Sequence, residues 1–122
     1  MGESVIDLDT LAVLDDLFDS NLYLTDLFPP YKEQVGTALN NLADAIARQD
    51  SKAVIFHAHG LKSSSAQLGA LRVSHACFEL ETLGHSPNWP EIVLGLVRLS
   101  QETAAAVMEL EGMEVERRTR AA

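Results

Sequence analysis

Apolar residues recur at spacings of three and four along most of this 122-residue chain, and glycine and proline interrupt the pattern in few places. Such spacing puts the apolar side chains on one face of an α-helix. No segment has a strand pattern of comparable strength. The sequence therefore predicts an all-α protein built from amphipathic helices.

Breaks in the pattern divide the chain into the expected helical segments. These are a short helix over residues 9–18, two turns over residues 22–28 that Pro29 and Pro30 end or kink, long helices over residues 30–49, 51–68 and 70–83, and a last helix that begins between residues 88 and 90 and ends before Gly112. Connections of two to six residues favour antiparallel neighbours. We therefore predict an antiparallel four-helix bundle with an additional short N-terminal helix.

The helix ends and the domain limits follow from the same pattern. Gly69 and Gly84 stand at the ends of expected helices, where glycine is common. The inward face of the last helix comprises Ile92, Val93, Leu96, Leu99, Thr103, Val107 and Leu110. Since one core organises about 100 to 150 residues, a single bundle is expected over residues 1–113. Residues 114–122 have no apolar face and are predicted to fray, with an extension of the last helix as the alternative.

Acidic residues outnumber basic ones by 18 to 9, so the formal net charge is −9. Phosphate backbones and anionic membranes repel such a surface, and binding to nucleic acid or to a membrane is therefore not expected. The single cysteine, Cys77, cannot form an intramolecular disulfide, and the N-terminus lacks the basic region of a signal peptide. These features favour a cytoplasmic protein.

The segment over residues 54–70 contains the most informative side chain, His59. At about 100° per residue, one side of the expected helix collects the core residues Val54, Ala58, Leu61, Ser65 and Leu68. His59 points about 140° away from the centre of that cluster. We therefore expect an exposed histidine and not a packed core residue.

The surface around His59 is expected to be smooth. The same face carries small and aliphatic residues and one lysine, namely Ile55, Lys62, Ser63, Ala66 and Ala70, with Phe56 alongside. Exposed apolar patches often mark docking sites. We interpret Ile55, Phe56, Ala66 and Ala70 as partner-docking residues. The alternative is that this surface binds nothing, since alanine and serine are also ordinary residues on the surface of a helix. The acidic residues Asp44, Asp50, Glu79 and Glu81 are expected to form a solvated surface.

An exposed imidazole is mostly neutral at pH 7, so one ring nitrogen keeps a lone pair that can attack phosphorus. The phosphoryl group acquired in this way is strongly anionic. Lys62 lies three residues after His59 on the same face and can neutralise part of that charge. These two residues are the candidate reactive pair.

The run His59-Gly60-Leu61-Lys62-Ser63-Ser64-Ser65-Ala66-Gln67-Leu68-Gly69-Ala70 resembles the motif of histidine-containing phosphotransfer (HPt) domains, His-x-Leu-Lys-Gly-Ser-x-x-x-Leu-Gly. Cys77-x-x-Leu80-Glu81-x-Leu83-Gly84 is similar to the next helix of that family, and the similarity spans most of the chain. The resemblance implies that His59 is phosphorylated and that Lys62 stabilises the phosphoryl group. It also implies that Ser63 and Gln67 lie in the surroundings of that group.

The resemblance further implies a phosphorelay intermediate. His59 would accept a phosphoryl group from a receiver-domain aspartate, in a response regulator or a hybrid sensor histidine kinase, and pass it to another receiver. Because the receiver supplies magnesium and the acidic pocket, the chain would need no cofactor and would be a monomeric carrier, not an enzyme. One departure stands at Ser63, where the family has glycine. Serine adds a hydroxymethyl group at the closest approach of the receiver.

Other functions fit parts of the sequence less well. A helical adaptor could dock receivers or another signalling enzyme without being phosphorylated, and Ser63 is its best support. A histidine-dependent hydrolase lacks a nucleophile elbow and an obvious oxyanion hole. A metal site is not expected, because His57 and His59 lie about 200° apart on the helix. Nucleotide-binding glycine loops are absent from the sequence.

Overall fold

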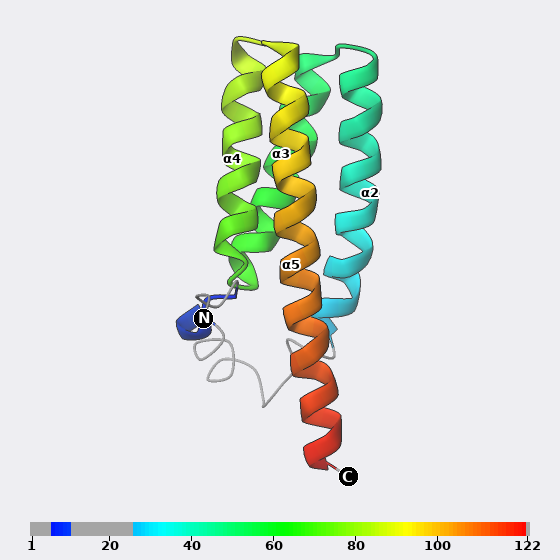
Figure 1. Ribbon diagram of the computed structural model, residues 1–122, viewed down its shortest axis with the longest axis vertical. Helices are drawn as coiled ribbons and strands as arrows, with labels where there is room; N and C mark the ends of the chain where they lie inside the picture. Colours follow the sequence, from blue (N-terminus) through cyan, green and yellow to red (C-terminus); the bar gives the residue numbers. More distant parts are fainter. Residues whose placement is uncertain (1–5, 11–25, 122) are drawn as a thin grey trace.

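The computed structural model describes residues 6–10 and 26–121 (Figure 1). Four helices make up most of this part of the chain, α2 (Phe28–Ala47), α3 (Ser51–Gln67), α4 (Leu71–His85) and α5 (Trp89–Ala121). Each helix packs against its neighbour in the sequence, and α5 closes the bundle against α2. The predicted all-α, antiparallel four-helix bundle is confirmed.

The predicted N-terminal helix lies mostly outside the described residues. Residues 8–10 form a helical turn. Residues 11–25 lie outside the described residues, and with them most of the helix expected over residues 9–18. The segment before this turn is held by the bundle. Ile6 is fully buried in the core, and the Asp7 backbone N–H donates a hydrogen bond to the Gly69 carbonyl oxygen at 2.7 Å. The N-terminal segment therefore lies against the connection between α3 and α4.

The start of α2 differs from the prediction. Asp26 and Leu27 form a π-helical turn that leads directly into α2, and Phe28 is the first α-helical residue. Pro29 and Pro30 occupy the first turn of α2, where a missing N–H costs no helical hydrogen bond. The expectation that these prolines end a helix is therefore wrong, since α2 continues through them. Residues 22–25 of the two expected turns lie outside the described residues.

Helix α3 begins at Ser51 as predicted, ends at Gln67, one residue before the predicted end, and has the predicted inward face. The Asp50 carboxylate caps its N-terminus by accepting a hydrogen bond from the Ala53 N–H at 3.1 Å. Gly69 follows its C-terminus with φ +77°, in the left-handed region that favours glycine. All four core positions expected within the helix are buried, namely Val54, Ala58, Leu61 and Ser65. The phase that defines the outer face of α3 is therefore confirmed.

A buried polar pair joins α3 to α2. The hydroxyl groups of Ser65 and Tyr31 lie 2.8 Å apart and share a hydrogen bond. Burial raises the pKa of Tyr31 to about 12, so the phenol stays protonated and can take part as donor or acceptor. Because an unpaired buried hydroxyl is costly, this contact favours one register of α3 against α2.

Helix α4 runs through to His85, so the prediction that Gly84 ends it is wrong. Gly84 is buried, and a Cβ atom there would lie 2.6 Å from Cγ1 of Ile55. The glycine therefore serves close packing of α4 on α3. Cys77 is buried as expected, and its burial raises the pKa of the thiol to about 12.

Helix α5 extends past the other helices of the bundle (Figure 1). The prediction that it ends before Gly112 is wrong, and the predicted fraying of residues 114–122 gives way to the alternative, a longer last helix up to Ala121. A glycine inside a helix costs only about 1 kcal/mol relative to alanine. An ion pair between Arg118 and Glu114 at i,i+4 spacing supports the extension.

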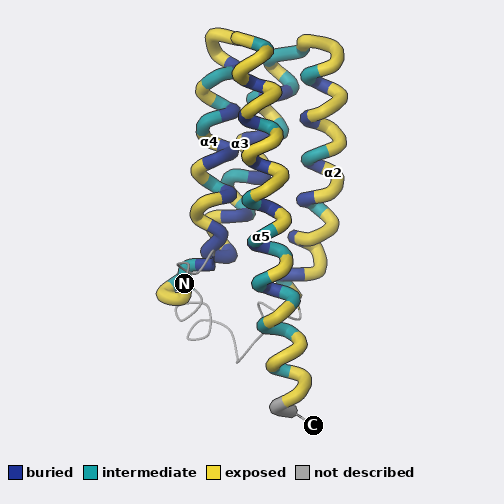
Figure 2. The backbone as a smooth tube through the Cα atoms, viewed as in Figure 1, coloured by how far each residue is buried: buried dark blue, intermediate teal, exposed yellow. Residues whose placement is uncertain are grey.

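Buried positions line the inward faces of all four helices (Figure 2). On α5 the fully buried side chains include Ile92, Leu99, Thr103 and Leu110, as predicted. Val93 is 46% exposed, so its predicted inward position is wrong. Among residues 6–10 and 26–121, no helix combines the length and apolar composition that crossing a membrane requires.

Candidate functional site

His59 projects from the outer face of α3, and 62% of its side chain is exposed. The predicted exposure of this histidine is confirmed. It follows from the helix phase, since the neighbouring residue Ala58 is fully buried in the core. The ring is therefore accessible to a second protein.

A glutamate of α4 meets both candidate reactive residues. Oε1 of Glu81 lies 3.2 Å from Nδ1 of His59 and 2.8 Å from Nζ of Lys62. Only 17% of the Glu81 side chain and 24% of the Lys62 side chain are exposed. The expectation that Glu81 belongs to a solvated acidic surface is therefore wrong. The carboxylate is half-enclosed between α3 and α4 and joins the histidine to the lysine.

The electrostatics of this triad favour an ionised carboxylate. The hydrogen bond from Lys62 lowers the pKa of Glu81 most, desolvation opposes it, and the hydrogen bond from His59 adds to the lowering. An ionised carboxylate only accepts hydrogen bonds, so Nδ1 of His59 carries the proton. The lone pair of the neutral ring is therefore on Nε2, the nitrogen that does not face Glu81.

Phe78 of α4 completes the surroundings of Lys62. The lysine Nζ atom lies 5.5 Å from the centroid of the Phe78 ring, a cation–π distance. The Phe78 side chain is itself 54% exposed. Together with Phe56, which is 73% exposed on α3, it places exposed aromatic rings on both helices of the site.

The surface beside His59 is open and built from small residues. Ser63 and Ala66 are exposed one and two turns beyond the histidine, and Ile55 is half-buried. Apart from the adjoining residues and backbone of α3 itself, no atom lies within 4 Å of a Cβ placed on Gly60. A hollow of 530 Å³ lies between α3 and α2 and is bordered by His59, Gly60, Phe56, Thr37 and Asn41 among others. A partner can therefore approach the ring closely.

Two residues of the predicted site lie elsewhere. Ala70 is fully buried, so its predicted role in docking is wrong, because α3 ends at Gln67 and the chain has already turned into the core. Gln67 is exposed and borders a hollow against α2 with Tyr31 and Gln34. It lies two turns beyond His59, about 12 Å along the helix axis. Its role near a phosphoryl group stays a prediction.

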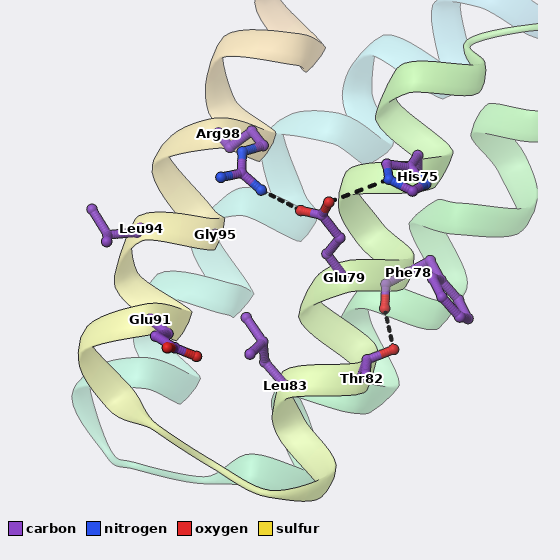
Figure 3. Close-up of a pocket in the computed structure, with 9 residues that line it drawn as sticks. All are labelled: His75, Phe78, Glu79, Thr82, Leu83, Glu91, Leu94, Gly95 and Arg98. Atoms are coloured by element: carbon purple, nitrogen blue, oxygen red, sulfur yellow. Dashed lines mark hydrogen bonds and ion pairs between the residues drawn. The ribbon is translucent and has the colours of Figure 1, made fainter.

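A second hollow, of 430 Å³, lies between α4 and α5 (Figure 3). On its rim the Glu79 carboxylate pairs with His75, at 3.2 Å, and with Arg98. The rest of its lining is mostly apolar, and it includes none of the three residues of the triad. In the part of the chain that the structure describes, no cluster of three or more metal-ligating side chains occurs. The chemistry therefore concentrates at His59.

Comparison with known proteins agrees with this geometry. Residues 27–113 match the family model of the Hpt domain. The fold is similar to that of histidine-containing phosphotransfer protein B (HptB) from Pseudomonas aeruginosa PAO1, with a TM-score of 0.86, 20% identity, and coverage of 94% of this chain and 98% of that one. It is also similar to ZmHP2, a histidine-containing phosphotransfer protein from maize, with a TM-score of 0.82, 17% identity, and coverage of 98% and 88%. No curated protein sequence matches the chain.

The match covers well over half of the chain, so the protein belongs to the Hpt domain family. Members of this family are phosphotransfer carriers and not classical enzymes, and they interact with receiver domains. The chain is accordingly a phosphorelay intermediate of two-component signalling.

Proposed function

We propose that His59 is the phosphoacceptor of this relay. A phosphoryl group would arrive from the aspartyl phosphate of one receiver domain and leave to the aspartate of another. The observation that supports this proposal best is the exposed ring of His59, held by Glu81 at Nδ1 with Nε2 turned away. His75, an exposed histidine of α4, pairs with Glu79 and not with Glu81.

The proposed step uses the lone pair of Nε2. As the N–P bond forms, the P–O bond to the aspartate breaks and the aspartate leaves as a carboxylate. The proton stays on Nδ1, and the ring becomes positively charged. The Glu81 carboxylate, 3.2 Å from Nδ1, stabilises that charge through a charge-assisted hydrogen bond. The reverse step passes the phosphoryl group to the next receiver.

Lys62 is proposed to stabilise the phosphoryl group on His59. Its ammonium group has three hydrogen-bond donors, so it can keep its contact with Glu81 while donating to a phosphoryl oxygen. The Lys62 side chain is 24% exposed, and its Nζ lies 5.5 Å from the centroid of the Phe78 ring. These contacts limit the lysine to positions near the histidine and lower the entropy lost when it binds the phosphoryl group.

The receiver domain is proposed to dock around the exposed ring. Phe56 and Ala66 supply apolar contact on α3, and the hollow beside Gly60 gives room for a side chain of the partner. Half-buried Ile55 supports this surface from below. Ser63 would lie at the closest approach, and its hydroxyl could donate a hydrogen bond to a phosphoryl oxygen.

The family and the charge of the chain also bear on its activity, cofactors and location. We propose that it has no catalytic activity and no cofactor of its own, since the receiver carries the magnesium site. We also propose a cytoplasmic location. With a net charge of −9, binding to nucleic acid or to anionic membranes is not expected.

A transfer assay tests the proposal. The chain is incubated with a phosphorylated receiver domain and magnesium, and the acid-labile phosphoryl adduct is measured. We expect an adduct on the native chain and on His75→Gln, which removes an exposed histidine elsewhere, and none on His59→Gln. Receiver binding without any adduct on the native chain would contradict the proposal and favour a docking adaptor.

A further inference from the structure

The described part of the chain exposes two aromatic side chains, and both lie next to the reactive pair. They are Phe56 of α3 and Phe78 of α4. The other aromatic residues in this part are enclosed, since Phe28 and Tyr31 are buried and Trp89 is partly buried. Aromatic side chains are enriched where proteins contact each other. Phe56 is a predicted docking residue, whereas the sequence assigns no role to Phe78.

A short series of contacts joins Phe78 to His59. Nδ1 of His59 lies 3.2 Å from Oε1 of Glu81, and the same oxygen lies 2.8 Å from Nζ of Lys62. That Nζ atom lies 5.5 Å from the centroid of the Phe78 ring. Even if these three steps ran in one straight line, Nδ1 and the ring centroid would be 11.5 Å apart. The Phe78 ring therefore lies within 11.5 Å of the reactive histidine.

The two aromatic rings lie on different sides of His59. Phe78 precedes Glu81 by three residues, so the two side chains share the face of α4 that meets α3. Figure 3 shows the Phe78 ring directed away from Leu94 of α5. Phe56 instead borders the hollow between α3 and α2. A surface that covers both rings therefore extends across α3 onto α4.

A receiver domain bound for phosphoryl transfer has to cover this surface. Its aspartyl phosphate must come within bonding distance of Nε2 of His59, so the receiver lies directly over the ring. A standard protein–protein interface buries about 800 Å² on each partner, which corresponds to a disc with a radius of about 16 Å. Phe78 lies inside that radius. The receiver is therefore the partner that the position of Phe78 fits.

The contact with Lys62 does not account for the exposure of Phe78. A cation–π contact uses one face of the ring, and more than half of this side chain is still exposed. The contact does restrict what can pack there. A basic side chain of the partner would be repelled by Lys62, whereas an apolar side chain would bury the exposed part of the ring without leaving a charge unpaired.

We propose that the receiver contact continues from α3 onto α4, where an apolar side chain of the receiver packs against Phe78. The inference rests on the proposed function, because His59 sets the position of the receiver. It adds a specificity-determining residue on a second helix. Packing against Phe78 would also exclude water from Nζ of Lys62, and a less polar environment strengthens the attraction between the ammonium group and a phosphoryl oxygen.

Receiver binding without transfer tests the proposal. Each receiver domain of the source organism is prepared with magnesium and beryllium fluoride, which mimics the aspartyl phosphate. Isothermal titration calorimetry then measures its Kd for the His59→Gln chain, which cannot be phosphorylated at that position. Adding Phe78→Ala should raise the Kd of the receivers that bind about tenfold, because the apolar contact is lost. Adding Phe78→Leu keeps an apolar side chain and should raise the Kd less than threefold.

Met108→Ala is the matched control. It shortens a large apolar side chain that is 71% exposed on α5, a helix that packs against α4 and α2. It should leave the Kd unchanged, and circular dichroism checks that all variants are folded. The proposal is overturned if no receiver binds, if Phe78→Ala binds as tightly as its parent, or if Met108→Ala weakens binding equally.

The result is separable from that of the transfer assay. A Phe78-dependent Kd together with no adduct on the native chain would support the docking surface and contradict the phosphoacceptor role of His59. An adduct on His59 together with an unchanged Kd in Phe78→Ala would do the reverse.

Discussion

Glu81 and Lys62 form an ion pair between α4 and α3, with 2.8 Å between Oε1 and Nζ, and both side chains are largely enclosed. The same carboxylate oxygen lies 3.2 Å from Nδ1 of His59. Isolated surface ion pairs contribute only about 0 to 1 kcal/mol to stability. The ion pair therefore matters more for the arrangement of the site than for stability. Glu81 sets which nitrogen of His59 carries the proton and keeps Lys62 close to the histidine.

Replacing Glu81 by glutamine should slow loading of His59. The amide oxygen can still accept from Nδ1, but the negative charge that stabilises the charged ring is lost. Charge-assisted hydrogen bonds are about twice as strong as neutral ones, so we expect roughly five- to tenfold slower phosphoryl transfer. Rapid-quench kinetics with a phosphorylated receiver measures the rate. Glu79→Gln, on the side of α4 that faces α5, is the control, and equal rates in both variants would remove Glu81 from the mechanism.

The lowered pKa of Glu81 predicts how this residue contributes to stability as pH changes. Folding favours its ionised form, so its contribution is present above the ordinary value of 4.5 and is lost as pH falls through the lower folded pKa. The difference in unfolding free energy between the native chain and Glu81→Gln should be constant above that value and shrink below it. Urea unfolding at a series of pH values measures this difference. A difference that grows on acidification would contradict the assigned direction.

Replacing Ser63 by glycine should preserve or speed transfer. Glycine restores the clearance beside His59 that the family motif has, at a cost of about 0.5 kcal/mol in helix propensity. Transfer rate and unfolding free energy are measured on the same variant. Ser64→Gly carries the same propensity cost on the neighbouring position and should leave transfer unchanged. A marked loss of transfer in Ser63→Gly alone would mean that the hydroxyl contacts the phosphoryl group.

Replacing Gly84 by alanine should destabilise the bundle. The added Cβ would lie 2.6 Å from Cγ1 of Ile55, so either the Ile55 side chain must shift or α3 and α4 must move apart. Overpacking of this kind costs about 1 to 3 kcal/mol, more than the gain of up to about 1 kcal/mol in helix propensity. Gly112→Ala, with no atom within 4 Å of its Cβ, should be stabilising. Denaturant unfolding compares the two, and an equal gain in both would refute the close contact.

The inner face of α3 and the exposure of His59 could be predicted because they depend on one helix alone. A single angular period fixes which of its residues are buried, and Val54, Ala58 and Leu61 are buried as that period requires. In α5 the three consecutive residues Ile92, Val93 and Leu94 are all apolar, so the helical period does not show which of them faces the core. The predicted inward position of Val93 is therefore wrong.

Contacts between helices were harder to predict. Nothing local indicates which residue of α4 lies opposite Lys62, so Glu81 was taken as part of a solvated surface. One signal was available. Glu81 lies one turn after Cys77, a position expected to be buried, and the angular count used on α3 would have placed it near the inner face. The predicted docking role of Ala70 is wrong for a related reason, because the prediction extended the helical phase past the end of α3.

The central claim, that Nε2 of His59 receives the phosphoryl group, is tested most directly by locating that group on the protein. The chain is loaded by a phosphorylated receiver, and ³¹P NMR together with fragment mass spectrometry identifies the modified residue and nitrogen. We predict a single phosphohistidine, at position 59, with phosphorus on Nε2. A phosphoryl group on Nδ1 of that ring, or on any other residue, would contradict the account.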